Sequence, residues 1–137
     1  MEKYPQPLPQ KLVDIAKQYD IDLIRDIVYC EDNSGYSSDY IGLGNFDDAD
    51  IEVIAFFHEL AHILMYNRIC NDLQISHQNM FSLCELSNEG MAWEYAILLA
   101  KKHGYTYDDF DCKELKYARN CLKSYIDSEV FKIEFDR

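Results

Sequence analysis

The sequence predicts an α+β fold in which a small mixed sheet packs against a central helix and two to three further helices. The central helix is indicated by residues 51–67, which contain neither glycine nor proline and are apolar on most sides. Strands are indicated before it by residues 21–30, rich in β-branched and aliphatic side chains, and by residues 37–44. Helices are indicated elsewhere by apolar residues at helical spacing.

The whole chain, residues 1–137, is expected to form a single domain. Hydrophobic residues make up 48% of it and aromatic residues 14%, which is typical of a globule with a buried core. The formal net charge of -12 argues against direct nucleic-acid binding, because affinity for phosphate depends mainly on Lys and Arg. A basic partner would fit this charge, although a solvated acidic surface explains it more simply.

Cysteine usage and the N-terminus indicate a cytoplasmic protein. The five cysteines are odd in number and include no C-x-x-C pair, which favours free thiols over a disulfide framework or a zinc ribbon. The opening residues, MEKYPQPLPQ, lack the apolar segment of a signal peptide. No run reaches the eighteen or so apolar residues that a membrane span requires, so no membrane association is expected.

The N-terminal part is expected to hold one helix and a hairpin or two neighbouring strands. A first helix should span about residues 9–19, because Leu12, Val13, Ala16 and Tyr19 recur at helical spacing. Residues 21–30 should form a strand, 31–35 a turn, and 37–44 a second extended segment.

The C-terminal part is expected to hold two helices and a short tail. Residues 80–102 predict a long helix that breaks near Ser87 and Asn88 and ends at His103 and Gly104. A capping box over residues 111–114 predicts the start of a last helix, whose apolar stripe is Leu115, Ala118, Leu122 and Tyr125. The alternating residues 131–135 predict a strand or an extended arm.

The central stretch carries an H-E-x-x-H motif, formed by His58, Glu59 and His62. Residues four apart lie on the same face of a helix, so both imidazoles can bind one metal ion while Glu59 flanks it. Zinc accepts such a pair with a third protein ligand and leaves a fourth position open for water, whose pKa it lowers to about 7. Without a metal, the motif would be a helix with two hydrogen-bonded histidines.

Three residues are candidates for the third ligand: Glu89, Glu94 and His77. Glu89 lies in the middle of an apolar helix face, whereas Glu94 lies about 140° away in a narrow polar wedge. A carboxylate in a core needs a cation, which favours Glu89, although a negative charge near a helix N-terminus is also favourable without a metal. His77, in the following loop, could instead complete a three-histidine site. Trp93 is expected to be a core residue.

These motifs resemble those of the ImmA/IrrE group of small zincin-like metallopeptidases. The similar segments are YIGL at 40–43, FHELAH at 57–62 and EGMAWEYAILL at 89–99. The resemblance implies a zincin-like fold, a Zn²⁺ cofactor bound by His58, His62 and Glu89, and Glu59 as the general base. Members of this group cleave or inactivate helix-turn-helix repressors. The chain departs from the group at Ala61, where glycine is usual, and at Met91, which replaces a second acidic residue.

The expected activity is therefore that of a gluzincin-like zinc metallopeptidase acting on a protein substrate, with a repressor-type regulator as the substrate that the resemblance implies. In zinc peptidases a strand just before the motif helix commonly binds the substrate at its free edge, a role open to residues 40–44. Tyr40, Tyr66 and Tyr95 are candidates for stabilising the oxyanion.

Two alternatives remain open. One is a zincin-scaffold interaction module that binds a regulatory partner without cleaving it. The other is a weaker likeness to SprT-like proteases, in which an H-x-x-x-F segment, here His77 to Phe81, supplies a third histidine ligand. The acidic charge and the missing C-x-x-C pair count against this second alternative.

Overall fold

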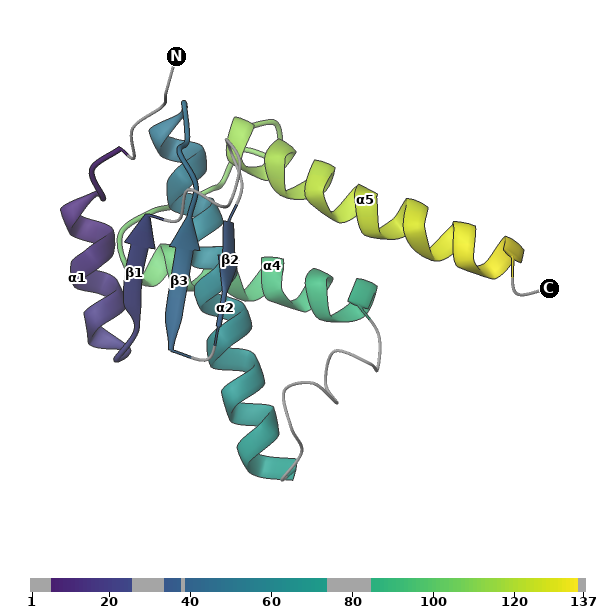
Figure 1. Ribbon diagram of the computed structural model, residues 1–137. Helices are drawn as coiled ribbons and strands as arrows, with labels where there is room; N and C mark the ends of the chain where they lie inside the picture. The colour runs from purple at the N-terminus through teal and green to yellow at the C-terminus, as the bar shows by residue number, and fades with distance from the viewer. Residues whose placement is uncertain (1–5, 26–33, 38, 74–84, 136–137) are drawn as a thin grey trace, which may run out of the picture.

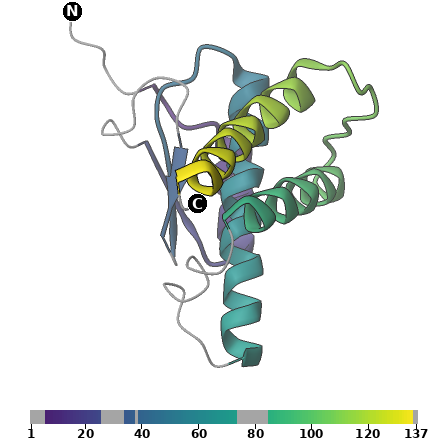
Figure 2. The same ribbon diagram turned by 90° about the vertical axis from the view of Figure 1, so that its right-hand side faces the viewer.

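The computed structural model describes residues 6–25, 34–37, 39–73 and 85–135 (Figure 1). Over these residues the protein is α+β, as predicted, with a three-stranded mixed sheet and four helices. The elements follow in the order α1 (Gln10–Gln18), β1 (Asp22–Arg25), β2 (Ser34–Tyr36), β3 (Tyr40–Leu43), α2 (Ala49–Leu73), α4 (Glu85–Lys102) and α5 (Lys113–Phe135). The sheet lies on one side of α2 and α4 on the other, and α5 crosses in front of α2 in Figure 2, from the α4 side toward the sheet (Figures 1 and 2).

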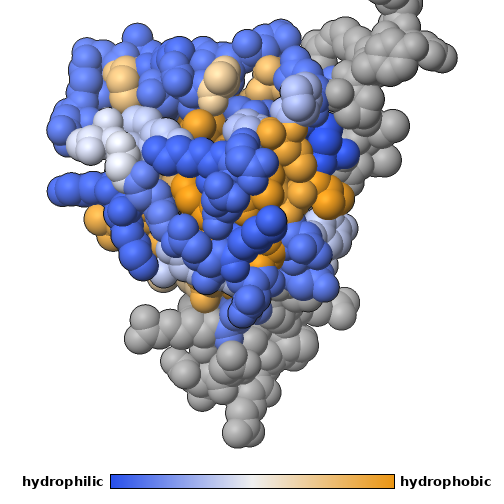
Figure 3. All heavy atoms as spheres, turned by 90° about the vertical axis from the view of Figure 1, so that its left-hand side faces the viewer, coloured by the Kyte–Doolittle hydropathy of each residue, from blue (hydrophilic) through white to orange (hydrophobic). Residues whose placement is uncertain are grey.

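Helix α1 forms where it was expected and covers one end of the sheet. Its buried face consists of Leu12, Ile15 and Ala16, whose spacing places them on one stripe. The helix ends at Gln18, and Asp20, two residues further on, has a left-handed φ of 57°. Figure 3 shows the α1 side of the molecule, where hydrophilic residues surround hydrophobic residues near the centre. This half-exposed position explains the amphipathic pattern of the helix.

The strand order in the sheet is β1-β3-β2. β1 is parallel to β3, with Asp22 opposite Tyr40, and β2 is antiparallel to β3, with Ser34 opposite Leu43. The first two extended segments were expected to form either a hairpin or two neighbouring strands. Because β1 and β3 are parallel, the hairpin is wrong and the prediction of two neighbouring strands is confirmed. Residues 40–43 form the central strand, so the prediction that this segment offers a free edge is also wrong.

The short strand β2 occupies residues that were expected to form part of a turn. Ser34 and Gly35 have the composition of a turn, but here they pair with β3, and Tyr36 stacks on the ring of His62. Strand propensity is a weak preference that contacts with neighbouring elements override. Among the described strands, β2 is an outer strand and lies beside α2.

Helix α2 is the central element, as predicted, and runs from Ala49 to Leu73. It begins at an aspartate cap, because the Asp48 carboxylate accepts the backbone N–H of Asp50 at 2.9 Å. The side chains of Phe56, Phe57 and Leu60 are fully buried. Because α2 packs on both the sheet and α4, it is apolar on most sides and is the scaffold on which the motif is held.

Helices α4 and α5 correct two predictions. Helix α4 is continuous through Ser87 and Asn88, because these residues lower helix propensity by only a few tenths of a kcal/mol each. Helix α5 includes residues 131–135, which were expected to be extended. No glycine or proline interrupts residues 113–135, so a five-residue alternation could not override the helix.

The ends of the elements agree with the turn signals. Helix α4 ends before Gly104, whose φ of +95° is left-handed, and residues 80–84 of the predicted helix lie outside the described residues. No described helix combines the length and the apolar character of a membrane span.

An ion pair between Arg25 and Glu52 joins the sheet to α2. Both side chains are only 6% exposed, and they approach at 2.5 Å. The guanidinium also donates to three backbone carbonyls, those of Gln6, Pro7 and Gly44. Because each of its three nitrogens donates to a partner within the protein, Arg25 ties the N-terminal segment, β1 and the start of α2 together.

We expect Glu52→Ala to lower the free energy of unfolding by about 3–5 kcal/mol, because it leaves the Arg25 charge buried without its partner. Urea denaturation followed by circular dichroism would measure this change. Glu94→Ala, on the exposed face of α4, is the matched control and should change the free energy by no more than about 0.5 kcal/mol. Equal midpoints for the two variants would contradict the expectation.

Candidate metal centre

Three side chains from two helices converge on one point. The Nε2 atom of His58 lies 2.8 Å from Glu89 Oε2, and the Nε2 atom of His62 lies 3.0 Å from Glu89 Oε1. The two Nε2 atoms are themselves 3.0 Å apart. The structure therefore brings together the two motif histidines and the third-ligand candidate that the helix wheel favoured, with all their ligand atoms within 4.8 Å.

The helix geometry explains this convergence. His58 and His62 are one turn apart on α2, so both imidazoles leave the helix on the face that packs against α4. Glu89 lies on α4 one turn before Trp93, on the buried face that contacts α2. The His62 side chain is 2% exposed and that of Glu89 is 12% exposed, so the centre is shielded from bulk water.

The electrostatics of the three residues favour a bound positive charge. Burial alone would raise the pKa of Glu89, but hydrogen bonds and charge from His58 and His62 lower it to about 2. Burial alone would lower the pKa of His58, but the Glu59 and Glu89 carboxylates raise it to about 9. Two imidazole nitrogens and a carboxylate are also the donor set that zinc accepts in hydrolases. The residues present therefore fit a divalent cation.

Aromatic rings hold the planes of both imidazoles. The indole of Trp93 stacks on His58 with 3.8 Å between ring centroids and 4° between planes. The ring of Tyr36 stacks on His62 at 5.0 Å and 9°. Trp93 is 5% exposed, which confirms its predicted place in the core. These contacts fix the orientation of each ring before any ligand binds.

Glu59 lies beside the three converging residues and not among them. Its carboxylate Oε1 accepts a hydrogen bond from Ser34 Oγ at 3.0 Å and lies 3.5 Å from His58 Nδ1. The residue is 6% exposed, so its carboxylate faces the site in a nearly dry environment. This position suits a group that exchanges a proton with a molecule held at the centre.

A cavity of about 300 Å³ opens onto the centre. Besides the motif histidines, Glu59 and Glu89, it is lined by Ser34, Gly35, Tyr36 and Tyr125. The sequence interpretation missed these four residues: it placed the first two in a turn and Tyr125 in an apolar helix stripe. The residues around Tyr36, Asn33-Ser-Gly-Tyr-Ser37, have no alternating pattern that would have indicated a strand.

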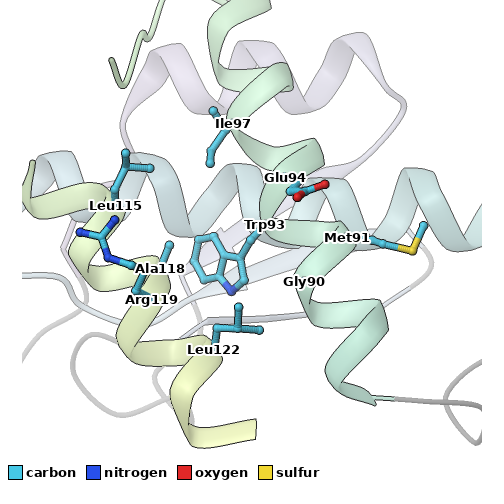
Figure 4. A pocket seen from close by; sticks show the side chains of 9 residues that line it. All are labelled: Gly90, Met91, Trp93, Glu94, Ile97, Leu115, Ala118, Arg119 and Leu122. Carbon is cyan, nitrogen blue, oxygen red and sulfur yellow. The ribbon is translucent and has the colours of Figure 1, made fainter. Parts of the chain in front are cut away.

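Of the other candidates for the centre, those that the structure describes lie elsewhere. Glu94 is exposed on α4 and lines a separate cavity of about 390 Å³ between α4 and α5 (Figure 4). The walls of this second cavity are mainly apolar, with Ile97, Leu115 and Leu122 among them. His77 and the side chain of Tyr66 lie outside the described residues. Tyr40 and Tyr95 are described but do not line the cavity at the centre.

Comparisons of this chain with protein-family models, with curated proteins and with solved structures find no match.

We expect the purified protein to bind about one zinc ion per chain, and Glu89→Ala to bind far less, because it removes the only carboxylate of the three converging residues. Zinc content after dialysis, measured by mass spectrometry, tests this. Glu94→Ala is the control and should keep its zinc. If His77→Ala lost the metal while Glu89→Ala kept it, the assignment of Glu89 would be wrong.

Trp93 is the single tryptophan of the chain, so the tryptophan fluorescence comes from one side chain that contacts the centre. Because its ring contacts His58, we expect Cu²⁺ or Co²⁺ to quench this fluorescence in a saturable titration. His58→Ala should abolish the saturable phase, and Glu94→Ala should leave it intact. Quenching that rises linearly in all three proteins would indicate collisions and not binding.

Proposed function

We propose that this protein is a zinc-dependent metallopeptidase with a zincin-like fold, which hydrolyses peptide bonds of a protein substrate. The observation that carries the proposal is the convergence of His58, His62 and Glu89 on one point, with the Glu59 carboxylate beside it. The resemblance to the ImmA/IrrE group supports the same assignment and implies a repressor-type regulatory protein as the substrate.

In the proposed hydrolysis, Glu59 transfers protons, and His58, His62 and Glu89 would bind the metal ion. When bound, zinc would polarise the scissile carbonyl and lower the pKa of the attacking water. Glu59 accepts the proton of that water and passes it to the leaving amine, which is the role of a general base followed by a general acid. The buried position of Glu59 excludes bulk water that would otherwise compete for the proton.

The outer strand β2 is the element on which an extended substrate would lie. It is paired with β3 on one side and contributes Ser34, Gly35 and Tyr36 to the cavity at the centre. A peptide held in this cavity would therefore lie against β2. This arrangement supports a polypeptide substrate and moves the expected binding strand from β3 to β2.

A second candidate function is that of an interaction module that binds a regulatory partner without cutting it. It is favoured by three large apolar residues exposed along α4, namely Met91, Tyr95 and Leu98. Their exposed fractions of 49%, 37% and 64% are typical of a surface that contacts another protein. A peptidase could use the same surface to hold its substrate, so activity has to decide between the two.

We expect Glu59→Gln to keep its zinc and to lose cleavage by about 10²–10⁴-fold, because the amide cannot accept the proton. The measurement is the appearance of new N-termini when the protein is incubated with a peptide library and with helix-turn-helix repressors. Addition of a zinc chelator should abolish cleavage by the wild type, and added zinc should restore it. If the wild type and Glu59→Gln behave alike on every substrate, the interaction module is the better description.

A further inference from the structure

We propose that Ser34 is a positioning residue that orients Glu59 for proton transfer. The inference rests on the proposed peptidase function and names a residue that the H-E-x-x-H motif does not contain. Its basis is the hydrogen bond from Ser34 Oγ to Glu59 Oε1, at 3.0 Å. Ser34 also lines the cavity at the centre, so the contact lies where the reaction would occur.

The Glu59 carboxylate needs such a support, because glutamate has several rotatable bonds. Two described side chains contact its Oε1 atom: His58 Nδ1 at 3.5 Å and Ser34 Oγ at 3.0 Å. The shorter contact is the one from Ser34, and it comes from a different element of the fold. The hydroxyl holds Oε1 and leaves Oε2 as the oxygen that accepts the proton.

The strand makes the position of Ser34 precise. Ser34 is paired with Leu43 of the central strand, and Leu43 is fully buried. Two residues further on, Tyr36 stacks on His62, so β2 contacts the centre at two points. These contacts fix β2 at Ser34 and at Tyr36. The Ser34 hydroxyl is therefore held next to Glu59 by a rigid element, as precise catalysis requires.

The test compares Ser34→Ala, which removes the hydroxyl, with Ser34→Thr, which keeps it. We expect Ser34→Ala to lower kcat by about 10- to 100-fold, since misplacing a catalytic group by about 1 Å costs about that much. KM and zinc content should stay at wild-type values, and Ser34→Thr should restore most of kcat. Ser37→Ala, just beyond β2, is the control and should have wild-type kcat.

A second measurement does not depend on activity. A double-mutant cycle with Ser34→Ala and Glu59→Ala, followed by urea unfolding of the zinc-free protein, should show a coupling of about three- to thirty-fold in the unfolding equilibrium constant. Strictly additive effects would mean that the hydrogen bond does not form and would overturn the proposal.

The outcomes separate this proposal from the proposed function. If the wild type cleaves and Ser34→Ala cleaves equally well, only the role of Ser34 is wrong. If Ser34→Ala loses its zinc together with its activity, the residue supports the fold of the centre and is not a positioning residue. If the zinc-loaded wild type cleaves nothing, the peptidase function fails, and the positioning role fails with it whatever the unfolding cycle shows.

Discussion

The close packing of α2 against α4 is the constraint on which the site depends. It places the Glu89 carboxylate against the imidazoles of His58 and His62 in a position that little water reaches. Burying a carboxylate beside two imidazoles costs free energy unless a positive charge balances the carboxylate. Protons on the imidazoles, or a metal ion in their place, supply that charge.

Much of this centre could be predicted from the sequence, because helical geometry is local. The spacing of His58 and His62 and the apolar face around Glu89 needed only the periodicity of a helix. The sheet was harder to predict than the helices, because the order of its strands depends on which segments pair. Pairing is a property of two segments and cannot be read from either one alone. Ser34 and Gly35 look like turn residues, and only Tyr36 packing on His62 and pairing with β3 make them a strand.

The sheet and the Arg25–Glu52 ion pair fix the position of the first half of α2, which carries the site. Arg25, at the end of β1, reaches the carboxylate of Glu52, which lies two turns before the motif. The central strand in turn carries β2, whose side chains face the cavity. The site is thus supported on one side by a sheet and on the other by α4, and rigid elements of this kind keep the side chains of a site at fixed distances.

Trp93 gives this architecture a further property. One of its contacts is the ring of His58, and another is with α5, where Ala118 and Leu122 pack against it and the second cavity opens (Figure 4). The indole therefore separates His58 from the C-terminal helix and contacts both. If binding of a cation at His58 shifts this ring, it also changes the packing of α5. Thermodynamic reciprocity then requires that a change in the packing of α5 alter the affinity for the cation by the same free energy.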